Sequence, residues 1–153
     1  MGERIPLGLL VPLRLLCGLI LVIEGWGKLR HGWLHGTQLS AMLDDWVDNH
    51  RTYAMFLPVV QAARSHPKIF AGLITSGELI IGLSMLLGVV TRATAFLGAV
   101  MLFSIAFGAG QGLAPPGNAL LMGAIFVIFI AAPPGRVLGL DAALRGRLPR
   151  WLA

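Results

Sequence analysis

The sequence has a single cysteine and few charged residues. Cys17 is the only cysteine, so the chain can form neither an internal disulfide nor a cysteine-rich metal site. Only 12% of the 153 residues are charged, whereas 56% are hydrophobic, and the mean hydropathy is +0.79. A water-soluble domain of this length has too small an interior for so much apolar surface. The composition therefore predicts an integral membrane protein.

Several motifs of autonomous function are also missing from the sequence. It contains no Cys-x-x-Cys-His motif, no Walker glycine loop and no serine nucleophile elbow. No basic patch is interleaved with aromatic residues, so we predict no nucleic-acid partner and attribute the net charge of +5 to membrane topology. Arg14 interrupts the first apolar run and no small-x-small site follows it, which argues against a cleaved signal peptide.

Four apolar runs are separated by turn signals. They cover residues 7–29, 69–90, 93–109 and 117–132. A membrane-spanning helix needs about 20 predominantly apolar residues, and these runs approach that length. Thr91 and Arg92 are expected to form a tight connection between the second and third runs, and proline pairs flank the fourth. We expect an all-α bundle of four transmembrane helices, forming a single domain over residues 1–153.

The connection over residues 32–68 is too long for a turn and too polar to span a membrane. Its apolar residues recur at helical spacing in two groups, which predicts one or two amphipathic helices at the outer membrane surface, the second of them around Pro58. The alternative is a solvated loop with chance periodicity. The two groups are Leu39, Met42, Leu43, Trp46 and Val47, and Phe56, Val59, Val60 and Ala63.

The distribution of basic residues predicts the orientation. Cytoplasmic segments of membrane proteins are enriched in lysine and arginine, so both termini are expected in the cytoplasm and residues 32–68 outside, in the inner (cytoplasmic) membrane of the cell. Basic residues within the outer segment leave the opposite orientation open. The residues predicted to be cytoplasmic are Arg4, Arg92, Arg136, Arg145, Arg147 and Arg150.

Ionisable residues within the predicted spans should face the bundle interior, because a charge facing lipid is costly. These residues are Arg14, Glu24, Lys28 and Glu78. Glu24 and Lys28 are four residues apart and are expected to pair on one helix, and Glu78 is expected to pair with Arg14. Small residues on the same helix faces are expected at the helix contacts: Gly18, Gly25 and Gly82.

Two interpretations of these four charged residues remain open. In the first, they form a pocket in which carboxylates exchange protons with a quinone head group or hydrogen-bond to it. In the second, they are buried ion pairs that fix the helix register. Neither interpretation assigns a catalytic residue.

The four histidines lie in or beside the segment 32–68. His31 and His35 are four residues apart, a spacing that suits one metal ion on a continuous helix. Gly32 and Gly36 weaken that helix, and no cysteine or acidic residue nearby completes a ligand set. We therefore predict no metal or haem site.

Short motifs in a fixed order resemble those of the DoxX superfamily, and specifically of the DoxD-like small subunit of thiosulfate:quinone oxidoreductase. The first run contains Arg14 and Gly18, then Gly27, Lys28 and Leu29. The second contains Glu78 and Gly82, followed by a Leu-Gly-Val-Val-Thr-Arg stretch over 87–92, and a Pro-Gly-Arg stretch over 134–136 precedes Leu140 and Asp141. The long first connection resembles the DoxD-like branch.

The resemblance implies a four-helix membrane bundle and a set of functions. These are transfer of electrons from reduced sulfur compounds to quinone, or a part in thiol-redox defence, with quinone as the cofactor and with further membrane or extracytoplasmic protein subunits as partners beside membrane lipid. One alternative is an accessory structural subunit of a larger respiratory or photosynthetic complex, without catalysis of its own. Another is a small transporter, because charges within a membrane can mark an ion path.

Overall fold

The computed structural model describes residues 7–110, 118–144 and 149, and all regular structure within these residues is helical. Four 3-10 turns, η1 to η4, accompany seven α-helices. The turns are η1 (Leu7–Leu9), η2 (Trp33–His35), η3 (Ala54–Phe56) and η4 (Pro134–Arg136). The helices are α1 (Leu10–Arg30), α2 (Thr37–Asp48), α3 (Leu57–Ser65), α4 (Pro67–Leu87), α5 (Thr91–Gly108), α6 (Asn118–Ala131) and α7 (Leu140–Ala143).

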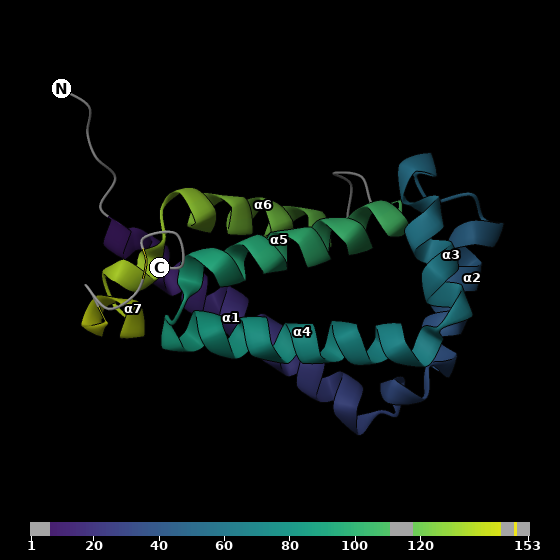
Figure 1. The fold of residues 1–153 in the computed structure, drawn as a ribbon, viewed down its shortest axis with the longest axis horizontal. Coiled ribbons are helices and arrows are strands. Elements are labelled where there is room, and N and C mark those ends of the chain that lie inside the picture. Colours follow the sequence, from purple (N-terminus) through teal and green to yellow (C-terminus); the bar gives the residue numbers. More distant parts are fainter. Residues whose placement is uncertain (1–6, 111–117, 145–148, 150–153) are drawn as a thin grey trace.

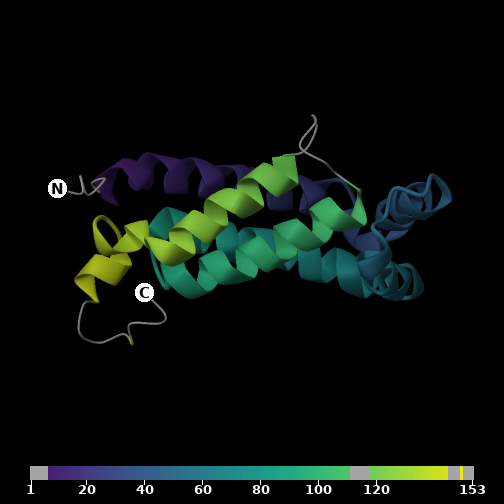
Figure 2. The same cartoon turned by 90° about the horizontal axis from the view of Figure 1, so that it is seen from above.

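The four longest helices form an elongated bundle. Helix α1 packs along α4, α5 packs along α6, and α4 also contacts α5 (Figure 1). Helices α2 and α3 lie across one end of the bundle, and α7 lies at the opposite end, as the second view also shows (Figure 2). The bundle therefore has one end covered by short amphipathic helices and one end formed by η4, α7 and the α4–α5 connection.

Three of these helices are long and apolar enough to cross a membrane. Helices α1 and α4 have 21 residues each and α5 has 18, with mean hydropathies of 1.7, 1.8 and 1.5. Helix α6 is apolar but shorter, with 14 described residues; the predicted Pro115–Gly117 boundary lies outside the described part of the chain. The expectation of an all-α integral membrane protein is confirmed. Large apolar side chains point outward, where lipid would contact them, such as Ile23, Ile80, Leu97 and Leu121.

Glycines set the close approach of α1 and α4. A Cβ atom added to Gly18 would lie 2.9 Å from the carbonyl oxygen of Gly82, and one added to Gly82 would lie 2.9 Å from that of Gly18. A Cβ atom on Gly25 would lie 2.9 Å from the Leu79 side chain. Small residues allow helix backbones to approach closely in this way, and membrane helices depend on such packing because lipid supplies little hydrophobic drive for association.

Two apolar clusters fill the interior. The first lies between the four long helices and includes Cys17, Met85, Leu102 and Phe126. The second lies beneath α2 and α3, where their buried apolar residues meet the start of α4. Because α2 buries Leu39 and Leu43, and α3 buries Val60 and Ala63, the helical spacing in residues 32–68 corresponds to two packed helices.

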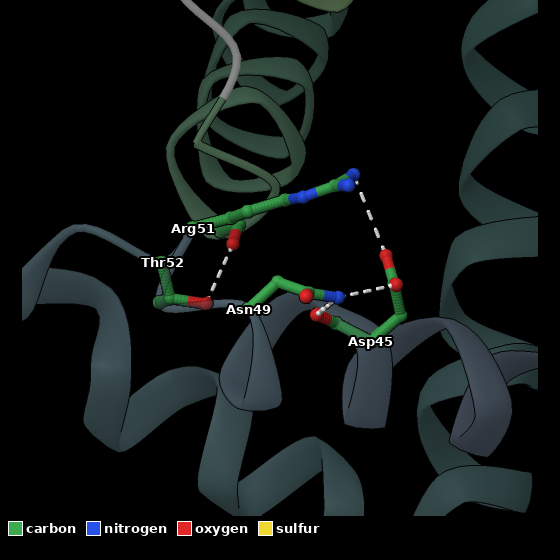
Figure 3. Close-up of polar contacts among 5 residues, drawn as sticks. Asp45, Asn49, Arg51 and Thr52 are labelled. Carbon is green, nitrogen blue, oxygen red and sulfur yellow. Dashed lines mark hydrogen bonds and ion pairs between the residues drawn. The ribbon is translucent and has the colours of Figure 1, made fainter.

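A polar network ties the end of α2 to the end of α5. Asn49 Nδ2 donates to Asp45 Oδ1 over 2.7 Å, and Arg51 Nη1 lies 3.4 Å from Asp45 Oδ2 (Figure 3). Thr52 Oγ1 donates to the carbonyl oxygen of Gly108 over 2.8 Å. The segment after α2 is therefore fixed to α5, which holds the two short helices over the bundle end.

The connection between α4 and α5 differs from the prediction. Thr91 and Arg92 are the first residues of α5, and the turn consists of Gly88, Val89 and Val90. Gly88 ends α4 with φ +65°, and Val90 has φ +51°, a conformation that is strained for a β-branched residue. The sequence argument placed the helix start too late because the polar Thr-Arg pair resembles a turn.

Candidate functional site

The buried ion pair between Lys28 and Glu78 is the centre of the candidate site. Lys28 lies in the last turn of α1 and Glu78 in the middle of α4, and the Lys28 ammonium donates a hydrogen bond to Glu78 Oε1. The Lys28 side chain is 20% exposed and that of Glu78 only 7%. Such groups occur within membrane helices where they pair with one another, because a lone charge there is costly.

This pairing corrects both ion pairs predicted from the sequence. Glu78 pairs with Lys28, so the expected Glu24–Lys28 and Arg14–Glu78 pairs are wrong. Helices α1 and α4 run in opposite directions, with Gly18 against Gly82 and Gly25 against Leu79, and this register puts Lys28 beside Glu78. Arg14 precedes Gly18 by one helical turn on α1, so it lies toward the bundle end opposite Lys28.

A cavity of about 490 Å³ adjoins this ion pair. Its lining comes from α1 to α6 and is mainly apolar, with side chains such as Ile20, Leu43, Phe70 and Met122. Lys28 and the two glutamates line it, and Trp33, Ser104 and Asn118 contribute further polar groups. Helices α2 and α3, which lie over the bundle end (Figure 1), also supply part of the cavity wall.

A second hollow of about 430 Å³ adjoins the same charged residues. It is more polar, and its wall includes His31 and Gln38. The two spaces share Glu24, Lys28 and Trp33, so these three side chains border both an apolar cavity and a polar one. That arrangement suits an amphipathic ligand with a polar head and an apolar tail.

Two polar atoms in the cavity wall are buried without a hydrogen-bond partner. One is Glu78 Oε2, an acceptor, and the other is Trp33 Nε1, a donor. Buried polar groups in proteins are nearly always hydrogen-bonded, so each exception needs an explanation. Because both residues line the cavity, these two atoms are candidate partners for a ligand.

At the opposite bundle end, Arg14 and Asp141 are each 2% exposed. Arg14 Nη1 donates to the carbonyl oxygen of Leu138 over 2.6 Å. The negative charge of Asp141 attracts the Arg14 guanidinium. Asp141 accepts hydrogen bonds from the backbone N–H groups of Val90 and Thr91, over 2.6 and 2.9 Å, and from the Thr91 hydroxyl. Asp141 therefore caps the N-terminus of α5 from a distant part of the chain.

The motif glycines at this end leave room for the cap. A Cβ atom on Gly135 would lie 2.7 Å from Asp141 Oδ2, and one on Gly88 would lie 2.8 Å from the Cα of Gly139. The sequence alone assigned Asp141 no role, although it belongs to the Leu140–Asp141 motif that follows the Pro-Gly-Arg stretch. It also missed Trp33 as a cavity residue, since a tryptophan near a span end is typical of the membrane interface.

The histidines do not converge on a shared site. His31 Nδ1 lies 2.7 Å from the carbonyl oxygen of Gly27. Gly32, with φ +73°, separates His31 from the η2 turn, and His35 is the last residue of that turn. Within the described ranges, no three histidine, cysteine or acidic side chains are placed to hold a metal ion. Arg4, Arg145, Arg147 and Arg150 lie outside those ranges.

Comparison with known proteins identifies one family. No curated protein and no solved structure matches the chain. The DoxX family model matches residues 9–111, most of the chain, and this region contains α1 to α5 with both members of the Lys28–Glu78 pair. The chain therefore belongs to the DoxX family of membrane proteins.

Proposed function

We propose that this chain is the membrane subunit of a quinone-linked oxidoreductase that acts on reduced sulfur or thiol compounds. The observation that supports the proposal is the apolar cavity whose wall contains the Lys28–Glu78 pair and the unpartnered Glu78 Oε2. Membership in the DoxX family supports a membrane protein with an oxidoreductase-related role.

The cavity suits a quinone in size and in chemistry. Its volume of about 490 Å³ lies within the range of about 300–1,000 Å³ that is typical of small-molecule sites. The apolar wall would take the isoprenoid chain, and the polar residues would take the head group. Lys28 has three N–H donors, one of which binds Glu78, so donors remain for a quinone oxygen.

The redox balance assigns this chain and its partner different tasks. Reduction of a quinone to the quinol takes up two electrons and two protons, and oxidation of two thiols to a disulfide releases the same number of each. The thiol or sulfur donor would bind to a partner subunit. Lys28 would polarise the quinone oxygen that receives charge, and the Glu78 carboxylate would accept a hydrogen bond from the quinol O–H that forms.

The test is quinone binding and turnover by the complex purified in mild detergent. We expect Lys28→Met to weaken binding of a short-chain quinone by about tenfold or more, since it removes the charged donor to a quinone oxygen. Glu78→Gln should slow turnover, since it removes the carboxylate that accepts a hydrogen bond from the quinol. Arg64→Gln, at the exposed Arg64–Asp44 pair of α3 and α2, is the control and should bind normally.

The outcome separates the two main functional hypotheses. Loss of turnover in both cavity variants, with weaker quinone binding in Lys28→Met, supports the oxidoreductase subunit. A complex that retains full activity with Glu78→Gln and Lys28→Met, or without this subunit, would contradict it. That result would favour an accessory structural subunit.

A further inference from the structure

The unpartnered atoms of Trp33 and Glu78 are of opposite hydrogen-bonding type. Trp33 Nε1 can only donate, and Glu78 Oε2, as part of a carboxylate bound to Lys28, accepts. Both residues line the apolar cavity, and Lys28 connects them: its ammonium binds Glu78 and lies 5.6 Å from the centre of the Trp33 ring. Two residues of the cavity wall therefore carry a buried donor and a buried acceptor beside one cation.

The local backbone fixes the position of Trp33. The η2 turn that contains it is bounded by Gly32 and Gly36, with φ values of +73° and +81°. A Cβ atom on Gly36 would lie 2.9 Å from the backbone nitrogen of Lys68, so the turn packs directly on the start of α4. The cation–π contact with Lys28 holds the indole from the other side. The indole N–H is thus a pre-positioned donor.

We propose that Trp33 is a ligand-binding residue and that Trp33 Nε1 and Glu78 Oε2 together recognise the hydroxyls of a quinol. One head-group oxygen accepts from Trp33, and a quinol O–H donates to Glu78. This inference rests on the proposed function and deepens it. A quinone has acceptors but no hydroxyl donor, so it satisfies Trp33 and leaves Glu78 Oε2 without a partner.

A preference for quinol has a consequence for the redox reaction. Tighter binding of the reduced form makes reduction of the bound quinone more favourable than reduction of the free quinone. A tenfold preference corresponds to about 30 mV for a two-electron couple. The site would therefore help a weakly reducing sulfur or thiol donor to deliver its electrons.

The experiment measures the affinities of one short-chain benzoquinol and of its quinone, under anaerobic conditions, for the full-length protein in lipid nanodiscs. We expect the wild-type protein to bind the quinol about tenfold more tightly, because a buried acceptor without a partner costs about that factor. Trp33→Phe keeps the ring and removes the donor, so it should weaken both forms by about fivefold to tenfold. Trp33→His, which retains a ring N–H, should recover part of this loss.

Trp26→Phe is the matched control, because Trp26 lies on α1 with 56% of its surface exposed and does not line the cavity. It should leave both affinities unchanged. Equal binding of quinol and quinone to the wild-type protein would overturn the proposal, even where a variant fails to fold. Wild-type affinity in Trp33→Phe, with binding lost in Glu78→Gln, would also overturn it and leave the proposed function intact. If the wild-type protein binds neither form, the proposed function itself is wrong.

Discussion

At the scale of single residues, the molecule separates its buried charges into two groups with different environments. Lys28 and Glu78 border a cavity, and Glu78 keeps a free acceptor. Arg14 and Asp141 lie where backbone groups of the chain surround them, and most of their hydrogen bonds are to that backbone. Arg14 Nε is also buried without a hydrogen-bond partner, but Arg14 lines neither cavity. The groups therefore differ in their access to a cavity.

Removing one member of the Lys28–Glu78 pair should destabilise the protein more than removing both. Lys28→Met leaves a buried carboxylate without a cation, a change that costs about 3–5 kcal/mol in buried pairs. We expect the double variant Lys28→Met with Glu78→Gln to recover part of this loss. The measurement is the temperature at which Cys17, the only thiol and only 3% exposed, becomes reactive to a thiol-specific dye. If the double variant loses as much stability as the two single variants added together, Lys28 and Glu78 do not interact directly.

Asp141→Asn should destabilise the bundle by about 2 kcal/mol or more. The substitution keeps the size of the side chain but removes the charge that caps α5 and attracts the Arg14 guanidinium. Thermal exposure of Cys17 measures this effect too. Asp48→Asn, at an exposed position on α2, is the control and should change stability by less than about 0.5 kcal/mol.

The residue pairings were the part of the site that the sequence could not predict. Arg14, Glu24, Lys28 and Glu78 were expected to face inward. The structure brings Arg14, Lys28 and Glu78 into the interior or the cavity wall, whereas Glu24 borders the cavity but is exposed. Which of them meet depends on the antiparallel register of α1 and α4, and no local pattern encodes that register. Asp141 reaches Thr91 across 50 residues, a contact that a single sequence does not reveal.

At the scale of the elements, the α1–α4 contact depends on the absence of side chains. Gly82→Ala places a methyl group against the backbone of α1 and should destabilise the protein by about 1–3 kcal/mol. Gly72→Ala on the same helix meets no atom within 4 Å and serves as the matched control, with stability equal to wild type or slightly higher. Protection of Cys17, which lies next to Gly18, reports on both variants. Equal effects of the two substitutions would show that helix propensity, and not close approach, governs this position.

Helix existence and type were easier to predict than helix ends. Long apolar runs predicted the membrane helices, because a bilayer demands continuous apolar surface. Helical spacing predicted the two short helices, because each buries one face. The predicted start of α5 was too late along the chain, because the helix is capped by the distant Asp141 and not by an adjacent residue.

At the scale of the whole molecule, the α2–α3 cover and the α7 end should lie on opposite sides of the membrane. Arg92 and Arg136 lie at the α7 end, which favours the cytoplasm for that end. In a Cys17→Ser background, Gln61→Cys on α3 should react in intact cells with a membrane-impermeant maleimide. Ala143→Cys on α7 should react only after the membrane is opened. The reverse labelling pattern would invert the orientation without altering the fold.

The cap on α5 also sets an order of events during synthesis. The first N–H groups of α5 receive Asp141 only after 50 further residues have been made. A nascent chain that ends before α7 already contains α1 to α6, including every described residue around the cavity, but lacks the Asp141 cap. The candidate site is therefore complete in sequence before Asp141 can cap α5.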